Sequence, residues 1–187
     1  MRLMLKDSWL GLRNSTTRLP FRYGASTLSR CPQAVLEVAI EAEGRVHRGW
    51  SGDCLPPGWF DKTPGRSYRD QIADILGSIT LARSAFAEVA SKPIGLFDSW
   101  REANHTSLVE RALMDAVSRA ARLSFAEAVR SHLFGIDPGA IHPRLAGLRP
   151  ADWLPKSPRN EVYIRHTVGL LDPLTTSEIG LGERVGD

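Results

Sequence analysis

The spacing of apolar residues changes once along the chain, from two residues in the first third to three or four residues beyond Ser67. Within the first third, Leu36, Val38 and Ile40 alternate with polar residues, a pattern typical of a strand with one buried face. Three segments have strand character: Arg2–Arg13, Ala34–Glu41 and Val46–Trp50. They predict a three-stranded antiparallel meander, with a turn at Glu43-Gly44. A sheet of this size is stable only if other elements cover its apolar face.

The helical period begins at Ser67 and predicts a helix of about six turns, which ends at Lys92-Pro93 because proline cannot continue the hydrogen-bond ladder. Its apolar stripe comprises Tyr68, Ile72, Ile75, Leu76, Ile79, Ala82, Phe86 and Val89. Strands followed by helices indicate an α+β fold, with the helices packed over the meander.

Two further helices have explicit start signals. Ser107-x-x-Glu110 and Ser124-x-x-Glu127 both match the capping box, in which two side chains satisfy free backbone amides at a helix N-terminus. The second helix is expected to end at Phe134-Gly135, where glycine permits a left-handed stop.

The organisation changes again after Gly135. Residues 1–135 form the first expected unit, and 136–160 are a proline-rich connection containing Pro138, Pro143, Pro150, Pro155 and Pro158. The segment Glu161–Val168 reads as a fresh strand, so residues 161–187 are expected to begin a second unit.

Charge and composition exclude several classes of protein. The formal net charge is only +3, from 24 basic and 21 acidic side chains, and the basic residues form no continuous stripe. Nucleic-acid binding is therefore not expected, since it depends on many simultaneous phosphate contacts. No stretch approaches the roughly 20 apolar residues that span a bilayer. Cys31 and Cys54 make no disulfide framework and are interpreted as packing residues of a reduced, cytoplasmic chain.

Familiar catalytic motifs are missing from the sequence. It contains no phosphate-binding loop, nucleophile elbow, Cys-x-x-Cys or His-Glu-x-x-His motif. The glycines Gly180, Gly182 and Gly186 have the wrong spacing for a dinucleotide loop. No histidine has a second ligand-type residue at a spacing that would build a metal site.

Two loops combine aromatic residues with turn residues. Arg18–Gly24 carries aromatics and cations between strand-like segments, and Trp50–Phe60 places three aromatics in a loop stiffened by proline and glycine. Such loops suit either a substrate-facing lid or a local plug of the core, and their composition does not decide between the two.

Three segments in order resemble the N-terminal capping domain of the enolase superfamily, in its mandelate racemase and muconate-lactonising branch. They are Thr17–Gly24, Gly49–Phe60 and Val109–Ala116. The resemblance spans most of residues 1–175, and its specificity comes from the order of the segments, since none is a catalytic motif. It implies a capping domain of three-stranded meander plus helices, followed by the first strand of a TIM-type barrel.

The resemblance also implies which residues contact a carboxylate substrate. Two cap loops would close over it with Arg18, Phe21, Arg22, Tyr23, Asp53, Leu55, Trp59 and Phe60. Glu161–Val168 stands where the first barrel strand should begin, so Arg165, His166 and Thr167 would approach the catalytic face. His166 is the one weak catalytic candidate.

The chemistry of that family abstracts a proton next to a carboxylate and stabilises the enolate with Mg²⁺, as in racemases, dehydratases and cycloisomerases. A barrel takes about 250 residues, and far fewer follow residue 160. We therefore expect a truncated cap that binds no Mg²⁺ itself, is inactive alone, requires a barrel in cis or in trans, and is able to form a homo-oligomer.

Two alternatives remain open at this stage. The chain could be a self-sufficient α+β binding or dimerisation module, with Trp50, Trp59 and Phe60 as interface anchors. A complete small enzyme that uses His166 with Asp172 is the weaker alternative, because nothing in the sequence fixes those two side chains at hydrogen-bond distance.

Overall fold

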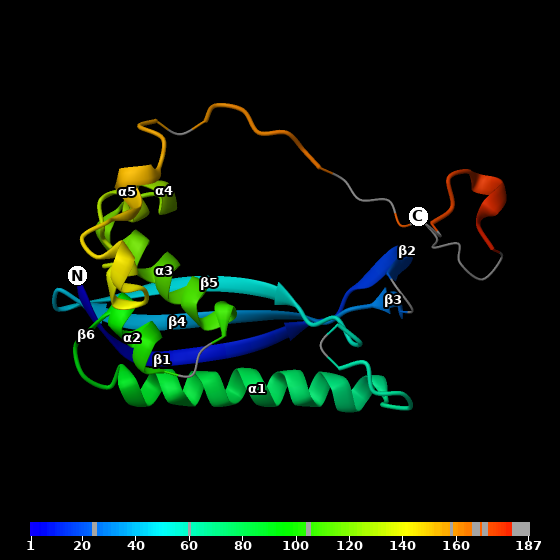
Figure 1. Ribbon diagram of the computed structural model, residues 1–187. Helices are drawn as coiled ribbons and strands as arrows, with labels where there is room; N and C mark the ends of the chain where they lie inside the picture. Colours follow the sequence, from blue (N-terminus) through cyan, green and yellow to red (C-terminus); the bar gives the residue numbers. More distant parts are fainter. Residues whose placement is uncertain are drawn as a thin grey trace.

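The computed structural model describes residues 1–23, 26–59, 61–103, 106–157, 159–165, 169 and 172–180 (Figure 1). The chain has the expected α+β class. Its strands are β1 (Arg2–Arg13), β2 (Thr16–Tyr23), β3 (Ser26–Arg30), β4 (Gln33–Ala42), β5 (Arg45–Cys54) and β6 (Ile94–Gly95). Its α-helices are α1 (Tyr68–Val89), α2 (Leu96–Glu102), α3 (Ser107–Ala121), α4 (Phe125–Arg130) and α5 (Pro150–Trp153).

The main sheet is antiparallel, with the strand order β5-β4-β1-β6. A turn at Glu43 and Gly44, both with positive φ, joins β4 to β5 as the sequence predicts. The sheet differs from a simple three-stranded meander in two respects. A separate hairpin, β2–β3, is inserted between β1 and β4, and β6 adds a two-residue pairing at the far edge of β1.

One face of the main sheet is buried beneath helices. Leu36, Val38 and Ile40 of β4 point to this face and are at most 1% exposed. They belong to one core with Phe86 of α1 and Leu113 of α3. Figure 1 shows α1 lying along β1 and α3 lying along β5. The helices therefore supply the cover that a small sheet requires.

Local capping chemistry fixes the ends of two helices. Ser67 is the N-cap of α1, where its side chain accepts a hydrogen bond from the Asp70 amide. The capping box at the start of α4 is also present: Ser124 accepts from the Glu127 amide, and the Glu127 carboxylate accepts from the Ser124 amide. Both helix starts agree with the sequence-based prediction.

Three other helix ends differ from their predictions. Helix α1 ends at Val89, a few residues before the expected stop at Lys92-Pro93. Helix α3 begins at Ser107 itself, with Thr106 as the N-cap and no side-chain cap, because Thr106 already holds the extended backbone of the cap position. Helix α4 ends at Arg130, well before Phe134. Its hydrogen-bond ladder stops in a turn where His132 has φ +59°, and the left-handed Gly135 closes that turn.

The strand expected over 161–168 is not formed in residues 161–165. Those residues have no regular secondary structure, and Val162, Tyr163 and Ile164 are at least 81% exposed. A strand needs a neighbour for its backbone hydrogen bonds, and none of the described strands pairs with this segment. Residues 166–168 lie outside the described residues. Before this segment, the proline-rich connection forms short helical turns, Pro138–Ala140, Pro143–Leu145 and α5.

Candidate ligand-binding cavity

A cavity of about 900 Å³ lies where the β2–β3 hairpin meets the end of β5 and the loop that leads into α1. Figure 1 shows the hairpin and this loop at the same end of the main sheet. The first half of α1 and the start of α3 complete the wall. Segments far apart in the sequence therefore enclose a volume that suits a small molecule.

The cavity wall is mainly apolar. Its principal apolar side chains are Phe21, Leu28, Leu55, Trp59, Ile75 and Ile79. Leu55 and Ile79 are buried, whereas Phe21 and Trp59 are 37% and 56% exposed as residues. The buried side chains favour an apolar ligand body, and two partly exposed aromatic rings are available to stack on it.

One polar group of the wall has an unused hydrogen-bonding capacity. The hydroxyl oxygen of Thr106, at the start of α3, is buried and lacks a hydrogen-bond partner within the described part of the chain. A buried hydroxyl without a partner is costly. Because this oxygen has almost no solvent-accessible surface, a ligand in the open cavity does not contact it as the wall stands.

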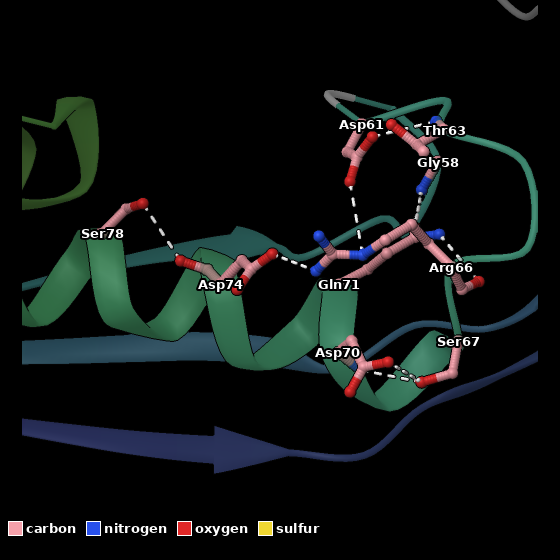
Figure 2. Close-up of polar contacts among 9 residues, drawn as sticks. All are labelled: Gly58, Asp61, Thr63, Arg66, Ser67, Asp70, Gln71, Asp74 and Ser78. Atoms are coloured by element: carbon pink, nitrogen blue, oxygen red, sulfur yellow. Dashed lines mark hydrogen bonds and ion pairs between the residues drawn. The ribbon is translucent and has the colours of Figure 1, made fainter.

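The carboxylates around the cavity are held by arginines. Asp53 of β5 pairs with Arg111 of α3 at 2.7 Å. Asp61 and Asp74 flank Arg66, with 3.6 Å between Asp61 Oδ2 and Arg66 Nε, as Figure 2 shows. Two guanidinium groups thus offset two of the three carboxylate charges, and one net negative charge remains among these five side chains.

The loop between β5 and α1 is fastened to the helix in the same region (Figure 2). The backbone N–H of Gly58 donates to the side-chain oxygen of Gln71 at 2.5 Å. Hydrogen bonds from Thr63, together with the nearby Arg66 guanidinium, hold the pKa of Asp61 below its ordinary value. These contacts fix the loop that carries Trp59 relative to α1.

The structure brings part of the predicted substrate-contacting set together. Phe21, Asp53, Leu55 and Trp59 all line the cavity. Three predicted residues are not among its lining residues: Arg18 and Arg22 of β2, and the exposed Arg165. Three others, Phe60, His166 and Thr167, lie outside the described residues, as does the side chain of Tyr23.

Several lining residues were not predicted from the sequence. Ile75 and Ile79 belong to the apolar stripe of α1, which the helical period assigns to the core without indicating which turns face a cavity. Leu28 and Thr106 have no sequence signal for this position, because it depends on how the hairpin and α3 fold back. Gln71 also had no sequence signal, because it reads as an ordinary polar residue of a helix.

No metal centre or membrane span is found in the described residues. Within them, no three His, Cys, Asp or Glu side chains gather closely enough to hold a metal ion. Nor does this part of the chain contain a helix with the length and apolar character required to cross a bilayer.

Comparison with known proteins gives no relative for this chain. No protein-family model matches the sequence, and no curated protein matches it either.

Proposed function

We propose that this chain is the substrate-specificity capping domain of an enzyme of the enolase superfamily, in the mandelate racemase and muconate-lactonising branch. The observation that carries the proposal is the meeting of two segments at one cavity. One segment follows β1 and contributes Phe21, and the other follows β5 and contributes Leu55 and Trp59. In the proposal these segments correspond to the two cap loops expected from the sequence, although the first of them, Arg18–Tyr23, lies in strand β2 and the second begins within β5.

The cavity narrows the class of substrate. Its mainly apolar wall suits a small molecule with an apolar body. The substrate carboxylate would then extend from the cavity toward a barrel domain, supplied in cis or in trans. Proton abstraction next to that carboxylate belongs to the barrel.

The described residues of the cap do not fit the Mg²⁺ ion of that chemistry. Magnesium is held by carboxylates in octahedral geometry, and the described residues offer no suitable cluster of three or more ligands. No metal-dependent step is therefore assigned to this chain. The isolated protein should give no Mg²⁺-dependent exchange of an α-proton in a carboxylate, and exchange by the pure chain would contradict its role as a cap.

Ligand binding tests the cavity directly. The full chain would be titrated with phenylacetate, 4-phenylbutyrate and acetate, with binding followed by NMR chemical-shift changes. We expect the two aromatic carboxylates to bind and acetate not to bind. Ile75→Ala should weaken binding several-fold. Leu81→Ala, on the same helix but 73% exposed and not among the lining residues, should leave it unchanged.

Two outcomes of this titration would refute the proposed cavity. One is that none of the three probes binds. The other is that the phenyl carboxylates bind equally well to the Ile75→Ala and Leu81→Ala variants, which would place the binding site elsewhere on the protein.

One observation favours the alternative of a dimerisation module. The outer face of the main sheet, opposite the helices, exposes Trp9 (61%), Val46 (58%) and Trp50 (42%). Exposed apolar patches commonly mark interaction surfaces. Sedimentation of the full chain would show a dimer that Trp9→Lys dissociates if this face is the interface. A monomer at high concentration would exclude the alternative.

A further inference from the structure

The only two cysteines of the chain meet in the wall of the cavity. Cys31 lies in the link between β3 and β4, and Cys54 is the last residue of β5. Both line the cavity, Cys31 as a buried residue and Cys54 as an exposed one. The sequence suggested only packing roles for them, since 22 residues separate the two positions.

Backbone pairing brings these two positions together. Cys54 is the register partner of Gln33, and the Leu55 N–H donates to the Pro32 carbonyl at 2.8 Å. The Cys31 thiol approaches the same carbonyl at 3.6 Å, and the Gln33 amide nitrogen lies 3.8 Å from the Cys54 sulfur. The two backbone segments that carry the cysteines are thus hydrogen-bonded side by side.

Cys54 also affects the ionisation of the Cys31 thiol. Burial raises the pKa of the Cys31 thiol, and the neighbouring Cys54 raises it further through its charge and through a side-chain hydrogen bond. Cys31 is therefore held protonated, whereas Cys54 faces solvent. This difference in exposure gives the two sulfurs different chemical roles.

We propose that Cys31 and Cys54 form an oxidisable dithiol in the cavity wall, which hydrogen peroxide converts into a reversible disulfide. This modification site is independent of the capping function proposed above. It would link the β3–β4 connection to the point where the loop carrying Trp59 begins, and so would act on the shape of the cavity.

The oxidation proceeds in two balanced steps. The Cys54 thiolate attacks one peroxide oxygen, the O–O bond breaks, and Cys54 sulfenic acid and hydroxide form. The Cys31 sulfur then attacks the Cys54 sulfur and the S–O bond breaks as the S–S bond forms. The departing oxygen takes the Cys31 thiol proton and leaves as water. Overall, two thiols and one peroxide give one disulfide and two waters, and a dithiol reductant reverses the change.

Thiol alkylation with intact-mass measurement tests the proposal on the full chain. The reduced protein is exposed to hydrogen peroxide, quenched, denatured and treated with N-ethylmaleimide. We expect a monomer that carries no adduct and has lost two hydrogens, and that takes two adducts after reduction with dithiothreitol. Because the chain has only two cysteines, an intramolecular disulfide joins Cys31 to Cys54.

A single-cysteine variant provides the control. Cys54→Ser changes an exposed residue and leaves Cys31 buried, so its one thiol should survive the same peroxide treatment and take one adduct. The proposal is overturned if the wild-type protein keeps two alkylatable thiols, or loses them only to sulfinic acid or to disulfide-linked dimers. Equal loss of the thiol in Cys54→Ser would also overturn it, since the two cysteines would then oxidise independently.

Discussion

The backbone of Gly49 on β5 lies directly against the backbone of Ala116 on α3. A Cβ atom added to Gly49 would come within 2.3 Å of the Ala116 nitrogen and equally close to the Ala112 carbonyl oxygen. Real Cβ atoms do not approach backbone atoms this closely. The missing side chain of Gly49 therefore sets how near α3 packs to the sheet, and with it where the start of α3 meets the cavity.

Gly49→Ala should lower the free energy of unfolding by about 2–3 kcal/mol, because α3 must shift away from β5 to make room. Gly52→Ala is the matched control on the same strand, since its Cβ would have one neighbour within 4 Å, at 3.6 Å. Urea denaturation of both variants checks the prediction. Equal destabilisation by the two substitutions would mean that the contact with α3 does not limit this position.

The hydrogen bond from Gly58 to Gln71 should control the loop that carries Trp59. Gln71→Leu removes the acceptor, so hydrogen exchange at the Gly58 amide should accelerate and stability should fall by about 1 kcal/mol. Gln71→Glu keeps an acceptor at the same place and should preserve the protection. Amide exchange followed by NMR distinguishes them, and similar exchange rates in both variants would show that other contacts hold the loop.

Much of the fold was predictable because it is locally encoded. The N-cap of α1 at Ser67, the capping box at Ser124 and the turn at Glu43-Gly44 depend on residues a few positions apart. Sheet pairing between distant segments was not encoded in this way. The β6 pairing with β1 depends on where the chain returns after α1, and the strand-like pattern over 161–165 forms no strand because no described neighbour pairs with it.

The residues of the candidate site also fall into two groups: those that local sequence could identify, and those whose position depends on how distant segments pack. Phe21 and Trp59 could be singled out because each is an aromatic residue in a segment rich in turn residues, and the resemblance to a capping domain assigned both to the substrate. Ile75 and Thr106 could not, since the helical period identifies an apolar face but not what covers each turn. The meeting of Cys31 with Cys54 likewise depends on the register of β4 with β5, which two isolated cysteines in the sequence do not reveal.

The two predicted capping boxes should behave differently on mutation. Ser124→Ala removes the side-chain cap of α4 and should cost about 1 kcal/mol. Ser107→Ala changes a residue already inside α3 and should alter stability by less than about 0.5 kcal/mol. Chemical denaturation of the pair measures both values. A larger loss for Ser107→Ala would mean that its hydroxyl caps α3 after all.

The segment 159–165 should be the first site of proteolysis. Tyr163 is fully exposed and has no regular secondary structure, whereas Phe86 is fully buried in α1. Brief chymotrypsin treatment should therefore cut after Tyr163 and spare α1, and the product that ends there should keep the thermal midpoint of the whole chain. Mass spectrometry identifies the cut. Resistance at Tyr163 would indicate that this segment is covered in solution.

The capping box of α4 should make stability depend on acid pH. Hydrogen bonds from the Ser124 side chain and amide lower the pKa of the Glu127 carboxyl below its ordinary value. A carboxyl with a lowered pKa in the folded state stabilises that state above its ordinary pKa, and this contribution disappears as the pH falls through the lowered value.

Glu127→Gln isolates that contribution, because glutamine keeps an acceptor but does not titrate, while every other carboxyl of the chain is unchanged. The wild-type protein should have the higher thermal midpoint at neutral pH, where its carboxylate also favours the N-terminus of the helix. The difference between the two proteins should shrink as the pH falls below the ordinary carboxyl range. A difference that stays constant across the acid range would show that the charge of Glu127 does not contribute to the cap.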